Sequence, residues 1–197
     1  MKTVIVFDHP YTIKASENQP HFRSYSAAIA KEASTSITAH GGEVDLIDLH
    51  ADHFDPVMHQ ADLENWRTKR PINAQAEDYY QRLASADRII FIFPIWWEVM
   101  PAMTKGFIDK VLTKYHYAKK SPHVLPRNPE IDVLTVSGTP TPLYRLIFGN
   151  PVTKALKRGT FGKLGLRHYH WQNFNPEHQT EIQRQKALKK VDRLLKA

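Results

Sequence analysis

The 197-residue chain contains no cysteine. It therefore cannot form disulfides, bind a metal through thiolates or use a cysteine nucleophile. It also lacks any apolar run that reaches the roughly 20 residues of a membrane span. The apolar stretch at its start is cut short by Asp8 and Pro10, so we expect no secretory signal peptide. Together these absences predict a protein that stays in the cytoplasm.

Several well-known site motifs are also missing. The chain has no GxGxxG, no GxxxxGK followed by Ser or Thr, and no GxSxG. A Rossmann dinucleotide fingerprint, a P-loop and an α/β-hydrolase nucleophile elbow are therefore not supported. His168 and His170 share one face of a predicted strand, but no third ligand stands at a recognisable spacing, so we expect no metal site.

The charge is one-sided, with 27 Lys and Arg against 20 Asp and Glu. The basic residues are nevertheless spread along the chain, and the clusters are only pairs such as Lys119-Lys120, Lys157-Arg158 and Lys189-Lys190. Nucleic-acid-binding domains usually gather such charge on one compact face. The surplus is better explained by attraction of anionic nucleotides, and we expect no nucleic-acid partner.

Strand and helix patterns alternate along the chain. The predicted strands are 3–7, 43–49, 88–93, 131–136 and 164–171. The predicted helices are 24–40, 74–85, a helix that starts at Pro101, and 176–196. Residues 52–73 are expected to be irregular, and 140–163 to form a loop or short helices. Because no repeat or linker divides the chain, we expect a single domain over residues 1–197.

This alternation favours a parallel sheet that is covered by helices on both faces. The continuous apolar run from Ile89 to Phe93 suits a strand buried on both sides. With five strands, the expected fold is a flavodoxin-like three-layer α/β sandwich with strand order 2-1-3-4-5. Ligands of such sheets bind beyond the carboxyl ends of the strands. The loops after Phe7, Phe93 and Val136 are therefore the candidate site.

The first of these loops opens with His9 and ends at Ser24, directly before a predicted helix. A helix N-terminus exposes unpaired N–H groups and carries partial positive charge, so it suits a phosphate. Ser24 and Ser26 add hydroxyl donors, and Arg23 or His9 adds charge. The alternative is an ordinary serine N-cap without a ligand.

The second loop contains Trp96 and Trp97, which cannot both point into one core from extended backbone. In one interpretation Trp97 packs inward and Trp96 lies on a flat ligand ring, whose polar edge meets backbone N–H groups. The alternative is a hydrophobic plug or a dimer contact.

The third loop begins Ser137-Gly138-Thr139. Gly138 permits close backbone approach, and the hydroxyls offer donors without blocking a ring. Tyr144 would bring a phenol to the same cleft. A proline-stiffened surface loop is the alternative. Together the three loops would supply a phosphate cradle, a ring wall and a contact for a pyrimidine edge.

The stretch from Phe93 to Leu112, FPIWWEVMPAMTKGFIDKVL, resembles the signature of the flavodoxin-like NAD(P)H:quinone oxidoreductases. Ala102, Lys105, Gly106 and Asp109 match that signature as well as the aromatic residues do. The resemblance runs from Thr3 to about Phe174. The family includes bacterial modulator-of-drug-activity proteins and ancillary proteins of potassium efflux systems.

The resemblance implies a bound flavin, FMN or FAD, that takes hydride from NADH or NADPH and reduces a quinone-like acceptor. It maps site residues by position. The phosphate loop maps to His9, Ser24, Tyr25 and Ser26. The ring contacts map to Pro94, Ile95, Trp96, Trp97 and Glu98, and the third loop to Val136, Ser137, Gly138 and Thr139. The family's active-site tyrosine falls on Tyr144, and the substrate side on His116 and Tyr117.

The chain also departs from the family pattern. Its first loop is longer than usual, and Asn150 stands where mammalian members have a histidine that assists proton transfer, so a tyrosine–histidine relay is not expected. The resemblance further implies a homodimer with the site near its interface. Two alternatives remain open, which are a regulatory flavoprotein subunit on a membrane transporter such as a potassium efflux system, and a passive flavodoxin-like electron carrier.

Overall fold

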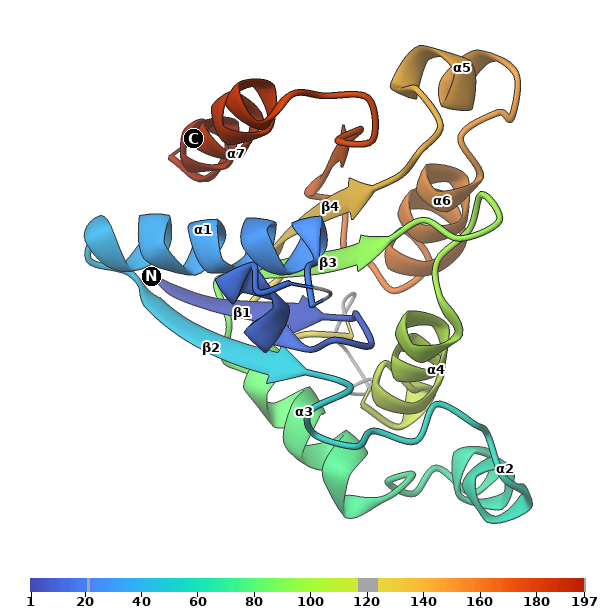
Figure 1. Ribbon diagram of the computed structural model, residues 1–197. Helices are drawn as coiled ribbons and strands as arrows, with labels where there is room; N and C mark the ends of the chain where they lie inside the picture. The colour runs from blue at the N-terminus through green and yellow to red at the C-terminus, as the bar shows by residue number, and fades with distance from the viewer. Residues whose placement is uncertain (21, 117–123, 197) are drawn as a thin grey trace.

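The computed structural model describes residues 1–20, 22–116 and 124–196. Five strands form one parallel sheet in the order β2-β1-β3-β4-β5, and Figure 1 shows β2, β1, β3 and β4 side by side. They are β1 (Lys2–Phe7), β2 (Glu43–Asp48), β3 (Arg88–Pro94), β4 (Glu130–Val136) and β5 (Tyr169–Phe174). The central strand β3 is buried along its whole length, as its unbroken apolar run predicts. The flavodoxin-like topology is confirmed.

Helices cover both faces of the sheet. On one face, α1 (Tyr25–Ala39) and α7 (Glu181–Leu195) pack over the side chains of β1, β3 and β4. On the other face, α3 (Ala74–Ala84) and α4 (Ala102–Val111) form the larger core with residues of the segment after α5. The remaining elements are 3-10 helices η1 (Ile13–Glu17) and η2 (Lys114–His116), helices α2 (Gln60–Arg67), α5 (Thr141–Leu146) and α6 (Pro151–Thr153), and the π-helix η3 (Lys154–Phe161).

The carboxyl ends of four strands meet at one edge. Phe7 pairs with Ile92, and Val136 pairs with both Pro94 and Phe174. Just beyond the strands, Ile95 N–H donates to the Val136 carbonyl at 2.7 Å. The loops after β1, β3 and β4 therefore leave the sheet side by side, as the topology predicts.

Asp8, at the end of β1, fixes the start of α4. Its carboxylate is buried and accepts hydrogen bonds from Thr104 N–H at 2.9 Å and Thr104 Oγ1 at 2.5 Å. His50 Nε2 lies 3.0 Å from its other oxygen. Because α4 follows the double-tryptophan loop, this contact holds the end of that loop against the sheet, while β3 holds its start.

Three expectations about the elements are corrected. Residues 52–73 contain α2, which begins with a capping box between His59 and Asp62. The last strand is 169–174 rather than 164–171, because Leu166 packs into the core directly after η3. The last helix begins at Glu181, capped by Thr180, rather than at Pro176. No helix in the described ranges is both long and apolar enough to cross a membrane.

Candidate functional site

A cleft of about 650 Å³ opens at the carboxyl edge of the sheet and continues between α1 and α7. All three predicted loops contribute to its wall. Of the predicted cofactor residues, those that line it are Ser24, Tyr25, Pro94, Ile95, Trp96, Val136, Ser137 and Gly138. Those that do not are His9, Ser26, Trp97, Glu98 and Thr139. The sheet therefore brings the three loops together as the sequence predicts.

At the start of α1, Ser24 is the N-cap, and its Oγ accepts a hydrogen bond from Ala27 N–H at 3.2 Å. Tyr25 donates its hydroxyl hydrogen to the Arg184 carbonyl at 2.9 Å, and burial raises the pKa of Tyr25 to about 12. Arg23 and Lys31 also line the cleft, and neither has an ion-pair partner in the described ranges. This end of the cleft therefore offers positive charge and N–H donors to an anionic group.

Two predicted members of the phosphate loop lie off the cleft wall. Ser26 is buried in α1. His9 turns toward the loop itself, where its Nδ1 accepts a hydrogen bond from Tyr11 N–H at 3.2 Å. Burial lowers the pKa of His9, with the nearby Asp8 opposing the shift. A neutral His9 supports the loop and adds no fixed charge to the cleft.

The extra residues of the first loop form a wall of the cleft. Their helix η1 is attached to β2, because Ile13 N–H donates to Asp48 Oδ2 at 2.7 Å. Ala15 packs into the core, and Ala15, Ser16 and Asn18 face the cleft. Near the end of the loop, Phe22 stacks on Tyr11 with ring centroids 4.6 Å apart. The sequence revealed this extra length but not its role.

The double-tryptophan loop contains a tight turn. Trp96 and Val99 exchange backbone hydrogen bonds of 3.0 and 3.1 Å, and φ is +50° at Trp97 and +63° at Glu98. Such a turn usually carries Asn and Gly, since other residues are strained there. The turn leaves Trp97 97% exposed, so the expectation that it packs inward is wrong. Trp96 faces the cleft as predicted.

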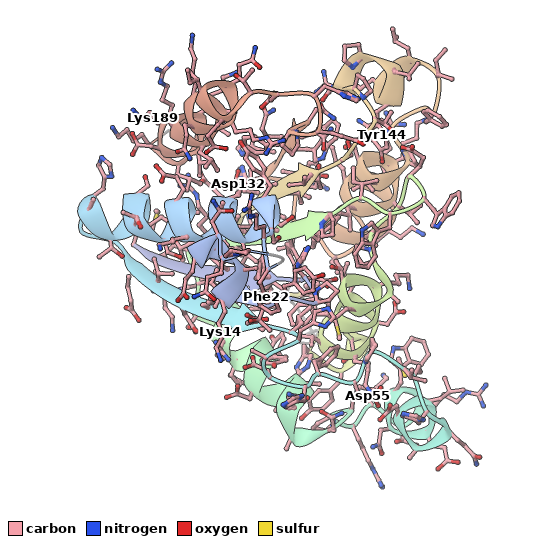
Figure 2. The ribbon with its side chains drawn as sticks, viewed as in Figure 1. Lys14, Phe22, Asp55, Asp132, Tyr144 and Lys189 are labelled. Atoms are coloured by element: carbon pink, nitrogen blue, oxygen red, sulfur yellow. The ribbon has the colours of Figure 1, made fainter. Side chains whose placement is uncertain are left out.

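Tyr144 supports this turn from behind. It belongs to α5 and is fully buried (Figure 2), and its hydroxyl donates to the Glu98 carbonyl at 2.9 Å and accepts from Val152 N–H at 3.2 Å. Burial raises the pKa of Tyr144 to about 12. Thr139 Oγ1 donates to Glu98 Oε1 at 2.9 Å. The expectation of a phenol in the cleft is therefore corrected, because the hydroxyl is used within the protein.

A polar network below the third loop fixes the bend at Ser137–Thr139. Asn173 Nδ2 donates to Ser137 Oγ at 2.9 Å, and Asn175 Nδ2 donates to the Ser137 carbonyl at 2.9 Å. Thr135 Oγ1 donates in turn to Asn173 Oδ1 at 2.8 Å. Sequence analysis missed both asparagines. The signal available in the sequence was the presence of two amide side chains at the end of an edge strand, because buried amides need hydrogen-bond partners.

His116 lies apart from the cleft. Its ring stacks on Tyr80 with centroids 3.4 Å apart, and its Nε2 lies 3.7 Å from Glu77 Oε2. Burial lowers the pKa of His116, and Glu77 opposes that shift. The predicted substrate-side role of His116 thus has no support within this chain's own cleft. Tyr117 lies outside the described residues.

No group of three or more His, Asp or Glu side chains in the described ranges is placed to hold a metal ion. His170 instead lies beside a buried carboxylate, with its Nδ1 3.4 Å from Asp132 Oδ1.

The profile of a family described as having a flavodoxin-like fold matches residues 1–195. The chain belongs to that family. It is 25% identical over 194 residues to a Haemophilus influenzae protein named an uncharacterized NAD(P)H oxidoreductase, which covers 95% of this chain and 90% of that one. Membership of this family agrees with the resemblance seen in residues 93–112.

Solved structures share the fold along nearly the whole chain. Smu.1420 from Streptococcus mutans UA159 is 30% identical with a TM-score of 0.79, over 98% of each chain. The NAD(P)H:quinone oxidoreductase from Methanothermobacter marburgensis is 19% identical with a TM-score of 0.80, over 98% of this chain and 93% of that one. An FMN-dependent NADH-azoreductase from Bacillus anthracis, solved with FMN, is 19% identical with a TM-score of 0.74, over 98% and 97%.

Proposed function

We propose that the protein is a flavin-dependent NAD(P)H oxidoreductase that reduces quinones or similar small acceptors by hydride transfer. The observation that carries this proposal is the single cleft shared by the α1 N-terminus, Trp96 and the bend at Ser137–Gly138. The names of the Haemophilus influenzae and Methanothermobacter marburgensis proteins support the reaction class.

The residues of the cleft fit a flavin. Its volume of about 650 Å³ is within the usual range of small-molecule pockets. The α1 N-terminus with Ser24, together with the cations Arg23 and Lys31, suits a phosphate. Trp96 offers an aromatic wall, and Gly138 lets a ring edge approach the backbone.

A bound flavin supplies the redox chemistry, because it can take hydride from a nicotinamide and return it to an acceptor. The chain's own residues position that group. Pro94, Ile95 and Trp96 would hold the ring, and backbone N–H groups of the bend would stabilise charge at its polar edge. Tyr144 donates its hydroxyl hydrogen to the Glu98 carbonyl, so its role would be to position the loop that carries Trp96.

The cleft also bears on which flavin binds. Beyond the α1 N-terminus it continues past Lys31 and Thr35 of α1, and past Gln185 and Leu188 of α7. The helix rises about 16 Å from Ser24 to Thr35 at 1.5 Å per residue. FMN would fill the part of the cleft next to the strands. The groove between α1 and α7 has room for the adenosine of FAD, so we propose that the chain accepts both flavins.

The decisive experiment is an absorption spectrum of the purified protein, with chromatography of the flavin released from it. We expect a yellow protein, or one that becomes yellow on reconstitution with FMN or FAD. Under anaerobic conditions NADH or NADPH should bleach the flavin band, and a quinone should restore it. A colourless protein that takes up neither flavin would contradict the proposal. A flavin that is bound but not reduced by either nicotinamide would favour a passive electron carrier.

We further propose that the protein forms a homodimer through an apolar surface beside the cleft. Its members are exposed and come from the tryptophan turn and from the segment 143–148, which Tyr144 joins to each other. They are Trp97, Val99, Leu143, Leu146, Ile147 and Phe148. Exposed apolar surface of this kind is typical of protein–protein contacts.

A further inference from the structure

A carboxylate lies against the bend that follows β4. A Cβ built on Gly138 would come within 2.3 Å of Glu177 Oε2, so the carboxylate rests directly on the glycine backbone. Glu177 also lines the cleft together with Ser137 and Gly138. Within residues 1–20, 22–116 and 124–196, the carboxylate has no hydrogen-bond or ion-pair partner. The carboxylate is exposed, and the nearby Arg184 donates its Nε–H to the Pro176 carbonyl rather than to Glu177.

The main chain that carries Glu177 is fixed to the bend. Asn175 Nδ2 donates to the Ser137 carbonyl at 2.9 Å, and Arg184 Nε donates to the Pro176 carbonyl at 3.0 Å. Pro176 itself restricts φ just before Glu177. The main chain at Glu177 therefore keeps a constant position relative to a ligand that contacts Gly138.

Charged side chains of both signs line the cleft. The cations are Arg23 and Lys31 on the α1 side and Arg184 on α7, and the carboxylates are Glu32, Glu181 and Glu177, of which Glu177 lies at the bend. Glu181 accepts a hydrogen bond from Gln185 Nε2 at 2.7 Å and does not come within 4 Å of a Cβ built on Gly138, whereas Glu177 does. At the bend, Glu177 therefore opposes part of the stabilisation that the backbone N–H groups would give to a ligand group that gains negative charge.

We propose that Glu177 lowers the reduction potential of the bound flavin. This inference rests on the proposed function, which places the pyrimidine edge of the flavin at Gly138. A flavin bound there would accept a hydride from NAD(P)H, which leaves as NAD(P)⁺, and the added negative charge would reside on the pyrimidine ring. The Glu177 carboxylate would repel that charge and so would weaken the binding of reduced flavin relative to oxidised flavin. The flavin consequently becomes a stronger reductant toward the acceptor, which receives the hydride and takes a proton from water.

The test compares the midpoint potential of the flavin bound to wild type, Glu177→Gln and Glu177→Asp, alongside the affinity of each protein for oxidised FMN and FAD. Glu177→Gln keeps the shape and removes the charge. We expect it to bind reduced flavin at least tenfold more tightly relative to oxidised flavin, which for a two-electron couple raises the potential by about 30 mV. Glu177→Asp keeps the charge but moves it away from Gly138, because the aspartate side chain is shorter. It should therefore give an intermediate potential. Glu181→Gln on the same wall is the matched control and should leave the potential unchanged.

Equal potentials for wild type and Glu177→Gln, with flavin bound to both, would overturn the inference and leave the proposed function intact. Equal shifts in Glu177→Gln and Glu181→Gln would also overturn it, because a general charge effect would then explain the result. If neither flavin binds to wild type, the proposed function fails, and this inference fails with it.

Discussion

Gly106 is the residue at which α4 comes closest to the loop that follows β2. A Cβ there would lie 2.2 Å from the Pro56 carbonyl oxygen and 2.5 Å from its Cα. Lys110, one turn later, donates to the Val57 carbonyl at 2.9 Å and pairs with Asp62 at 2.9 Å. Gly106 belongs to the Lys105-Gly106 pair of the family signature. It is therefore the position at which the backbone of α4 contacts the backbone of the loop.

Replacing Gly106 with alanine should destabilise the fold by about 1–3 kcal/mol, because rigid backbone opposes the new methyl group. Urea unfolding measures the loss. Gly159→Ala is the matched control, since its Cβ would lie 3.7 Å from the nearest atom, the Lys154 carbonyl oxygen. A similar loss in both variants would show that the contact with Pro56 is unimportant.

Tyr144→Phe should lower the free energy of unfolding by about 1–3 kcal/mol, because the Glu98 carbonyl and Val152 N–H lose a buried partner. We expect acceptor turnover to fall as well, because the turn beside the cleft is less well held, while flavin remains bound. Tyr115→Phe, at an exposed position, is the control. Lower turnover with unchanged stability would instead indicate a direct role of the phenol in catalysis.

The sequence was sufficient to predict which loops form the site but not where each side chain of them points. Trp97 was misplaced because its turn requires positive φ at two residues, and Trp-Glu gives no hint of that, as Asn-Gly would. The position of Tyr144 was predicted wrongly because the direction of its side chain depends on how α5 packs against the rest of the chain. The sequence alone does not show that packing. The amide network of Asn173 and Asn175 likewise joins partners that are distant in sequence.

At the scale of elements, strands were easier to predict than their ends. The other four strands were found almost to the residue, whereas β5 contains His170, Gln172 and Asn173 and was placed too early. Its polar residues contact the third loop or lie at the edge of the sheet, so the strand lacks the usual apolar pattern. The short polar helix α2 was missed for a similar reason, because its mean composition resembles that of a loop.

The groove between α1 and α7 offers a test at this scale. Gln185→Trp would fill it with a bulky ring at an exposed helix position. We expect FAD to bind at least tenfold more weakly, which corresponds to about 1.4 kcal/mol, while the affinity for FMN is unchanged. Fluorescence titration of the flavin-free protein with each flavin gives both affinities. Equal losses for FMN and FAD would show that the groove does not hold the adenosine.

For the whole molecule, the exposed apolar surface predicts the oligomeric state. Ile147 is 70% exposed within that surface, so Ile147→Lys should convert a dimer into a monomer. Analytical ultracentrifugation of the two proteins measures the change. Ile182→Lys is the matched control, because Ile182 is 82% exposed but lies on α7. A dimer that persists in Ile147→Lys, or a wild-type monomer, would contradict the proposed interface.

The stability of the whole molecule should also depend on His116. Burial lowers its pKa from 6.5, so the unfolded chain takes up the proton first as the pH falls. The resulting stabilisation is complete above pH 6.5 and is lost as the pH decreases through the lower pKa of the folded state. Urea unfolding from about pH 7.5 to about 5.5 should therefore show a shallower decline in His116→Gln than in wild type. Parallel declines would refute this, and His178→Gln, at an exposed position, is the control.

The positive φ angles of Trp97 and Glu98 have a consequence for directed evolution of the protein. Each costs of order 1–3 kcal/mol relative to a glycine at the same place. A screen that rewards heat resistance alone should therefore repeatedly recover glycine or asparagine at these two positions. A screen that rewards turnover should retain the native pair if the shape of the turn at Trp96 serves the reaction, and comparing the two populations would separate what folding prefers from what activity requires.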